Sequence, residues 1–403
     1  MQRSQVIGSI ANIMGFAAIL SASRSSADTG SGLRASLHFA GQTLVEYQAR
    51  QVARAGADRI LILVSVITPA LSQAVDRLSA DGIPVALTRD MVSIVRDAPR
   101  DSDILMVADG AIIAQPHVEA IAAAQGNALL VTDDSRASAP FERIDAGQRW
   151  AGLARITPDL LFGTLDMIGD WDLALTLVRA AVQKGARRTT VPQDDLMDGR
   201  VALVDSQQQA DLVAQAVMTN GASTTRIRGG IEHYVLARLA RMVAPALMRM
   251  QVPALQVRVA SIALAAIALV PVQLEWVATG FCVALLALLM SEVADRLDHL
   301  ALRTSSDGWL AFATPSLALL AVALAGANAE AVHLALLLAI LMVADRWRRT
   351  GGAYPWMILT PASALVLLIV ATIFDAFPAG LEVATLGAIM SIAAIMLRYR
   401  TAS

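Results

Sequence analysis

The sequence contains little charge and almost no cysteine. Only 16% of its 403 residues are charged, 56% are hydrophobic, and the mean hydropathy is +0.56. A soluble protein normally has about 25% charged residues, so part of this chain must lie in a lipid bilayer. The single cysteine, Cys282, stands in an apolar run, which excludes an intrachain disulfide and a metal site built from several cysteines. We expect its thiol to be packed.

Basic tracts and clustered histidines are also lacking. The formal net charge is -2, and no run of Lys and Arg has the length expected for nucleic-acid binding, so nucleic acid is not an expected partner. The five histidines are scattered without the spacing of metal ligands, and no Ser-His-Asp arrangement is evident. We therefore expect the histidines to be structural.

The charge is unevenly distributed along the chain. Most Asp, Glu, Lys and Arg residues precede about Gly230, which indicates a soluble domain followed by a membrane domain. We predict a cytosolic α/β domain over residues 1–225, a juxtamembrane helix over 226–252 and six transmembrane helices over 253–403. Apolar residues and arginines alternate in the juxtamembrane stretch as in an interfacial amphipathic helix; a plain linker helix is the alternative.

Six apolar segments account for the predicted crossings. A hydrocarbon core of about 30 Å needs about 20 helical residues, so the shorter segments must extend into their flanks. Alternate connections lack Lys and Arg, whereas the others and the tail contain arginines. The positive-inside rule then places both termini in the cytoplasm, at the inner (cell) membrane. The segments are Pro253–Val272, Trp276–Val293, Trp309–Ala325, Ala331–Val343, Tyr354–Phe374 and Leu381–Leu397.

The N-terminal half alternates short β-type runs with helical patterns, which predicts a mostly parallel sheet covered by helices. The predicted strands are Phe16–Ser21, Arg59–Val64, Pro84–Leu87, Ile104–Ala108, Ala128–Thr132, Gly152–Ile156 and Val201–Val204. The predicted helices are Leu44–Ala55, Pro69–Ala80, His117–Gln125, Trp171–Lys184 and Gln207–Asn220. In such folds, sites gather at the carboxyl ends of the strands.

Two aspartates follow predicted strands in this half. Asp109 ends the run Ile-Leu-Met-Val-Ala-Asp-Gly, and Asp205 follows Val201–Val204. Together with Gly41-Gln42-Thr43-Leu44-Val45-Glu46-Tyr47, they resemble the sugar-nucleotidyltransferase family of GT-A-like α/β proteins. The resemblance implies that Asp109 and Asp205 bind Mg²⁺. Without this resemblance, Asp109 and Asp205 can each be interpreted as a carboxylate that caps a turn. A carboxylate at a strand end is normally solvated.

The loop after the first strand departs from that family's phosphate loop. Both family glycines are serines here, and Ala35 stands where the family has lysine, although Arg24 and Arg34 are nearby. The resemblance implies that these two arginines contact phosphates. Glu142 and Trp150 are further candidates for a nucleoside pocket, with packing on the sheet as the alternative for Trp150.

The connection after the second predicted crossing, from Ser291 to Ser316, resembles the CDP-alcohol phosphatidyltransferase family, whose signature is D-x2-D-G-x2-A-R-x8-G-x3-D-x3-D. With Gly308 on the third landmark, none of the family's metal-binding aspartates is retained. The positions of the four aspartates are occupied here by Ser291, Ala294, Phe312 and Ser316. The first glycine of the signature is replaced by Asp295, and its Ala-Arg pair by Asp298 and His299. We expect Glu292, Asp295, Asp298 and Asp307 to form a solvated helix end.

The two resemblances in this order imply a bifunctional enzyme of phospholipid head-group metabolism. Its cytosolic domain would use Mg²⁺ and CTP, and its membrane domain would transfer the phosphoalcohol group of a CDP-alcohol to an acceptor with release of CMP, but the lost aspartates predict an inactive membrane domain. The alternative is a non-catalytic scaffold or regulatory subunit that retains both folds. The implied partners are CTP or a CDP-alcohol, membrane lipid, and a second copy of the chain or a partner membrane enzyme.

Overall fold

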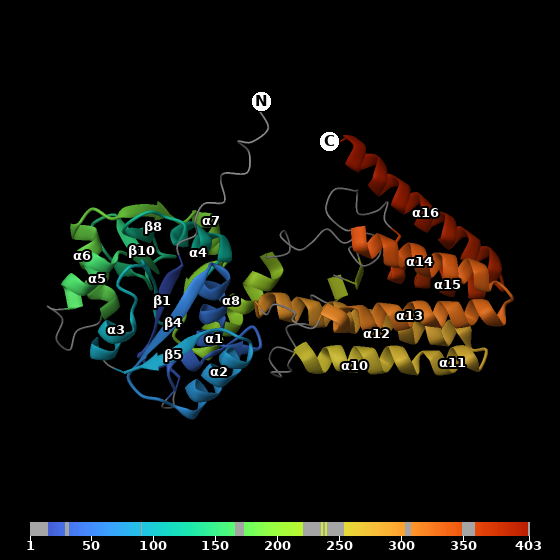
Figure 1. Ribbon diagram of the computed structural model, residues 1–403, viewed down its shortest axis with the longest axis horizontal. Helices are drawn as coiled ribbons and strands as arrows, with labels where there is room; N and C mark the ends of the chain where they lie inside the picture. Colours follow the sequence, from blue (N-terminus) through green and yellow to red (C-terminus); the bar gives the residue numbers. More distant parts are fainter. Residues whose placement is uncertain are drawn as a thin grey trace. The chain divides into compact units, whose positions relative to one another are not determined.

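Figure 1 shows a computed structural model of the chain. It describes residues 15–28, 32–89, 91–165, 173–220, 235–236, 238–239, 254–302, 308–348 and 359–401. Contacts within the chain separate two compact units, Met1–Asn220 and Gly221–Ser403. The juxtamembrane helix predicted over 226–252 lies outside the described residues, apart from residues 235, 236, 238 and 239.

The N-terminal unit is built on an eight-stranded sheet with the order β11-β8-β10-β6-β1-β4-β5, and β9 pairs with β10. Most neighbouring strands are parallel, as predicted, and β10 runs antiparallel to β6, β8 and β9. The strands are β1 Phe16–Ala22, β4 Ala57–Val64, β5 Val85–Thr88, β6 Ile104–Val107, β8 Ala128–Asp133, β9 Glu142–Arg143, β10 Gln148–Ile156 and β11 Arg187–Thr190.

Two small two-stranded sheets and eight α-helices complete this unit in the described residues. The small sheets pair β2 His38–Phe39 with β3 Gln42–Thr43, and β7 Ala111–Ile113 with β12 Val201–Leu203. The helices are α1 Leu44–Arg54, α2 Pro69–Ala80, α3 Met91–Asp97, α4 Gln115–Ala122, α5 Pro158–Leu165, α6 Leu173–Gln183, α7 Gln193–Met197 and α8 Gln207–Asn220.

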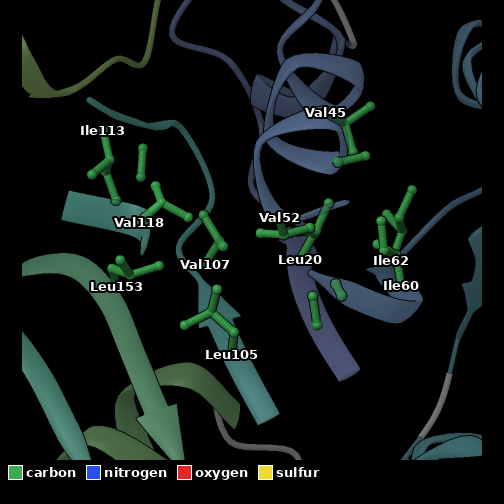
Figure 2. Close-up of a cluster of buried hydrophobic side chains, with 14 of the residues drawn as sticks. Leu20, Val45, Val52, Ile60, Ile62, Leu105, Val107, Ile113, Val118 and Leu153 are labelled. Carbon is green, nitrogen blue, oxygen red and sulfur yellow. The ribbon is translucent and has the colours of Figure 1, made fainter. Parts of the chain in front are cut away.

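Helices cover both faces of the large sheet, because successive side chains of a strand point to opposite faces. Leu20 of β1 belongs to a buried cluster with Val52 of α1 and Ile62 of β4, which Figure 2 shows close together. Ile19, the preceding residue of β1, belongs to a second cluster with Leu177 of α6. The central strand is therefore apolar on both faces, as is typical of α/β sheets.

Each predicted strand and helix corresponds to an observed element, but some observed elements were not predicted. The edge strand β11 has the sequence Arg-Arg-Thr-Thr, and most of it is exposed. It pairs in parallel with β8, a contact that follows from tertiary structure and not from any apolar pattern in β11 itself. The five-residue helix α7 has no buried residues and so lacks a helical pattern that the sequence could reveal.

The C-terminal unit is helical, and each of the six predicted apolar segments contains a helix. Within the part of the chain that the structure describes, three stretches are long and apolar enough to cross a membrane, namely Ala254–Gln273, Val277–Asp298 and Phe377–Ala394, which indicates a membrane protein. Six crossings remain a prediction. The helices are α10 Ala254–Ile267, α11 Leu269–Gln273, α12 Val277–Leu300, α13 Gly308–Asn328, α14 Val332–Arg348, α15 Pro361–Ile373 and α16 Phe377–Thr401. Cys282 is exposed on α12, so the expectation of a packed thiol was wrong.

Three connections of this unit close with the same backbone arrangement. The N–H groups of Trp276, Ala331 and Ala376 each donate to a carbonyl five residues earlier, at 2.8 Å. The residue before each donor has a positive φ of 53–64° and is acidic: Glu275, Glu330 and Asp375. This is the Schellman helix ending, in which glycine is the usual residue at positive φ. The three acidic residues therefore adopt a backbone conformation that glycine would adopt more easily.

Candidate active site

The candidate site forms at the carboxyl ends of β1 and β6. These strands are parallel neighbours, so the segments that follow them lie at the same edge of the sheet. Arg24 follows β1 and Asp109 follows β6. The backbone N–H of Arg24 donates a hydrogen bond of 2.7 Å to Asp109 Oδ2. The structure thus brings together the loop and the carboxylate that the sequence indicated separately.

Asp109 is buried, with 5% of its surface exposed. Burial raises the pKa of its carboxyl group to about 6, and the Arg24 N–H and the charge of Arg34 offset only part of this rise. Its Oδ1 atom is buried and has no hydrogen-bond partner in the described structure. The expectation of a solvated strand-end carboxylate was therefore wrong, because neighbouring segments cover the turn that contains Asp109.

That turn requires glycine after Asp109. The Ala111 N–H donates to the Ala108 carbonyl at 3.2 Å, and Gly110 has a φ of +80°, as at the third position of a type II turn. A Cβ atom on Gly110 would lie 2.3 Å from the Val204 carbonyl oxygen. Any side chain at this position would push the two segments apart.

Asp205 lies beside the same turn. Strand β12 pairs antiparallel with β7, and the Val204 N–H donates to the Gly110 carbonyl at 2.9 Å. Asp205 is the residue that follows this contact with Gly110. Its carbonyl accepts hydrogen bonds from the Ala27 N–H at 2.7 Å and from Ser26 Oγ at 3.0 Å, and the residue is half-buried. The Asp205 segment therefore packs on the loop after β1.

Both predicted arginines lie near Asp109. The Arg24 side chain is 3.9 Å from Glu142 (Nη2 to Oε1), and the two side chains are 40% and 47% exposed. Arg34 Nε donates to the Ser25 carbonyl at 3.3 Å, and its Cδ lies 3.5 Å from where a Cβ of Gly110 would be. Two cationic side chains thus border the buried carboxylate.

A cleft of about 460 Å³, including space open to solvent, lies beside Asp109. Its polar lining includes Ser23, Arg24 and Glu142, and its apolar lining includes Phe141 and Trp150. Trp150 is 3% exposed, and its Nε1 donates to the Leu153 carbonyl at 2.9 Å. Trp150 therefore packs on the sheet while it contributes to the wall of the cleft. A mixed lining of this kind, with apolar side chains and a few polar groups, is typical of a small-molecule site.

The carboxylate of Asp109 is suited to a magnesium ion that also contacts a substrate. No group of three or more His, Cys, Asp or Glu side chains that could hold a metal occurs within the described ranges. Mg²⁺ is often bound by only one or two carboxylates, with water and substrate phosphates as the other ligands. Asp109, with its buried and unpaired oxygen, fits that pattern; the backbone of Asp205 lies beside the same turn.

The known proteins that are similar to this chain share little sequence with it. No protein-family model and no curated protein sequence matches the chain. Among solved structures, a nucleotidyl transferase from Methanothermobacter thermautotroptrophicus is 18% identical with a TM-score of 0.36, and 51% of this chain covers 100% of that one. The inositol-1-phosphate CTP transferase from T. maritima is 13% identical with a TM-score of 0.37, over 50% and 96% of the two chains.

A third solved structure is a UDP-glucose pyrophosphorylase complexed with UDP-glucose. It is 9% identical with a TM-score of 0.33, over 42% of this chain and 88% of the other. Similarities of this size do not assign a family.

Gln48 of α1 contributes to the site but was not singled out in the sequence. It is 1% exposed, and its Nε2 atom donates to the carbonyls at both ends of the Asp109 turn, Ala108 at 3.1 Å and Ala111 at 2.8 Å. Nine consecutive residues of α1, from Leu44 to Val52, are buried. A glutamine on an ordinary amphipathic helix would be solvated, and only the burial of α1 on all sides gives Gln48 this role.

In the C-terminal unit, the acidic residues near the degenerate signature pair with arginines. Arg258 of α10 is 4% exposed, and its Nη2 lies 3.1 Å from Asp295 Oδ1 and also contacts Asp298. Arg296 Nε lies 3.4 Å from Glu292 Oε1, and Glu292 is 7% exposed. The expectation of a solvated helix end was wrong for these three acids, because α10 packs on α12; Asp307 lies outside the described residues.

The other residues of the signature occupy α12 and α13. Ser291 and Ala294 are buried, whereas Phe312 is 45% exposed and Ser316 is also exposed. Gly308 is the first residue of α13, and His299 lies near the end of α12. The side chain of His299 lies outside the described structure.

Proposed function

We propose that the N-terminal unit binds CTP with Mg²⁺ in the cleft beside Asp109 and transfers its cytidylyl group to a phosphorylated polyol. One observation supports this proposal above the others: Asp109 is buried and retains an unpaired carboxylate oxygen beside two arginines. A buried ionised carboxylate without a full set of partners is costly in free energy. A divalent cation between this carboxylate and a phosphate would supply the missing partner.

The side chains of the cleft have distinct roles in this proposal. Asp109 and Asp205 would hold Mg²⁺, which would offset phosphate charge and polarise the α-phosphorus. Arg24 and Arg34 would contact the phosphate oxygens. Their loop lacks the close-packed glycine amides of a typical phosphate loop, so side-chain charge would replace backbone N–H groups.

The reaction would be a displacement at phosphorus. A phosphate oxygen of the polyol phosphate would attack the α-phosphorus of CTP and form a new P–O bond. The bond from the α-phosphorus to the bridging oxygen would break, and pyrophosphate would leave. The products would be a CDP-polyol and pyrophosphate, with no oxidant or reductant required.

For the C-terminal unit, we propose a membrane role in phospholipid head-group metabolism without phosphatidyl transfer of its own. The pairing of Asp295 and Asp298 with Arg258 supports this, because both carboxylates already contact a fixed cation that would compete with a metal ion. The same pairing favours the second candidate function, a non-catalytic scaffold. Mg²⁺-dependent CMP release from a CDP-alcohol that is lost in Asp295→Asn would contradict both readings of this unit.

The proposal for the cleft is tested by calorimetric titration of CTP into the full-length protein in detergent, with and without Mg²⁺. We expect wild type to bind CTP only with Mg²⁺, and Asp109→Asn to lose this binding. Asp103→Asn is the matched control, because Asp103 precedes the amino end of β6 and pairs with Arg155 at 2.8 Å. Equal Mg²⁺-dependent binding by wild type and Asp109→Asn would show that the site is misplaced.

A further inference from the structure

The turn that contains Asp109 accepts two hydrogen bonds from a side chain of α1. Gln48 Nε2 has two N–H bonds, and it donates to both carbonyls that bracket the turn, Ala108 and Ala111. Both acceptors are carbonyl oxygens, so the amide must place its nitrogen toward them. Gln48 itself is 1% exposed, and water cannot easily replace its hydrogen bonds.

A second glutamine of the same helix makes a similar contact farther from the site. Gln51, three residues later and on the same face of α1, donates from Nε2 to the Ile113 carbonyl at 2.5 Å. It is 3% exposed. The two glutamines therefore attach opposite ends of β7 to α1, but only Gln48 contacts the turn that contains Asp109.

We propose that Gln48 is a positioning residue for the Asp109 carboxylate, fixing it for the metal and phosphate of the nucleotide. The part of this inference that concerns metal binding rests on the proposed function, whereas the hydrogen bonds from Gln48 to the turn do not depend on it. Loss of the Gln48 amide leaves the part-buried Ala108 carbonyl and the buried Ala111 carbonyl without that donor, and buried carbonyls need donors. The turn would then relax, and Asp109 Oδ2 would move away from the Arg24 N–H that it accepts at 2.7 Å.

The Arg24 amide reports the carboxylate position without any metal. We expect Gln48→Met to raise its hydrogen-exchange rate about tenfold, since the hydrogen bond to Asp109 protects this amide from local opening. Gln51→Met is the matched control, because it removes the same kind of hydrogen bond from the same helix. Exchange is measured on the full-length protein in detergent with EDTA, by mass spectrometry with residue-level fragmentation.

A second measurement uses Mn²⁺ as the probe, with CTP present. Removal of a group that orients a metal ligand typically lowers metal affinity about 10- to 100-fold. We expect such a loss in Gln48→Met and a change of less than about twofold in Gln51→Met. If Gln48→Met fails to fold, Gln48→Asn provides the same comparison, because its shorter amide cannot reach both carbonyls.

The outcomes separate the two proposals. Unchanged exchange at Arg24 in Gln48→Met, or an equal increase in Gln51→Met, overturns the inference about Gln48. A wild-type protein that binds no Mn²⁺ contradicts the proposed function only, because the exchange measurement contains no metal. Faster exchange at Arg24 with unchanged Mn²⁺ affinity overturns the claim that positioning serves the metal.

Discussion

The backbone N–H of Arg24 donates to Asp109 Oδ2 at 2.7 Å, across 85 residues of sequence. This bond ties the loop after β1 to the turn after β6. It exists because these two strands are parallel neighbours whose carboxyl ends share one edge of the sheet. The loop that contains the two arginines is thereby fixed against the one buried carboxylate of the cleft.

The raised pKa of Asp109 predicts that Asp109→Asn stabilises the protein at neutral pH. The pKa of about 6 in the folded state exceeds the ordinary value of 3.8, so folding favours the protonated form. The contribution of Asp109 to stability is full below about pH 4 and is lost as pH rises through about 6. At pH 7 we expect the variant to be more stable by about 2–3 kcal/mol.

This difference is measured by unfolding the full-length protein in detergent with EDTA, at pH 4.5 and pH 7.5. We expect the advantage of Asp109→Asn to shrink at the lower pH. Asp103→Asn is again the control and should show no gain at pH 7.5, because Asp103 is paired with Arg155. A variant less stable than wild type at both pH values would contradict the prediction that the buried, ionised carboxylate of Asp109 destabilises the folded protein at neutral pH.

The Arg258 pairing predicts a large loss of stability in Arg258→Met. This change leaves Asp295 and Asp298 without their shared cation in a buried setting. Breaking a buried ion pair typically costs about 3–5 kcal/mol, so we expect on the order of 3 kcal/mol here, since the acids are partly exposed. Thermal unfolding in detergent measures the loss.

The control for Arg258→Met removes the acids as well. Combining it with Asp295→Asn and Asp298→Asn should recover much of the lost stability, because neutral side chains no longer need the cation. A triple variant as unstable as Arg258→Met alone would instead attribute the loss to packing of the arginine side chain.

The acidic residues at positive φ predict that glycine stabilises their connections. Glu330 has a φ of 57°, and this conformation costs a residue with a side chain about 1–2 kcal/mol relative to glycine. We expect Glu330→Gly to raise stability by about 1 kcal/mol after the greater chain entropy of glycine is included. Glu382→Gly, at an exposed position in α16, should instead lower stability by about 1 kcal/mol. Thermal unfolding in detergent measures the change in stability of both variants. A loss of stability in both would contradict the prediction for Glu330.

The six-crossing topology predicts where reporters fused to the chain will lie. Reporters placed after Ser403 and near Arg348 should be cytosolic, and one at Asn328 should lie outside. The segment near Arg348 contains Arg346, Arg348 and Arg349, and the positive-inside rule acts most strongly on such a connection. An external reporter at Arg348 would contradict six crossings.

Several parts of this protein could be predicted because their causes are local. The β1 strand could be recognised from its apolar run, and the helices of the C-terminal unit from apolar segments near bilayer length. Asp109 could be singled out because an acid and a glycine follow a strongly apolar strand. Each of these signals lies within a few neighbouring residues, which is the range over which sequence patterns act.

Other features depend on contacts between distant residues and so required the tertiary structure. Nothing in the sequence around Asp109 shows that it is buried, because its cover comes from the loop after β1 and from β12. Gln48 and Arg258 acquire their roles only when α1 packs on the Asp109 turn and α10 packs on α12. The sequence by itself determined most of the helices and strands and the candidate acids. The tertiary structure decided which acids are buried and with what they pair, because burial and electrostatic pairing depend on segments brought together by folding.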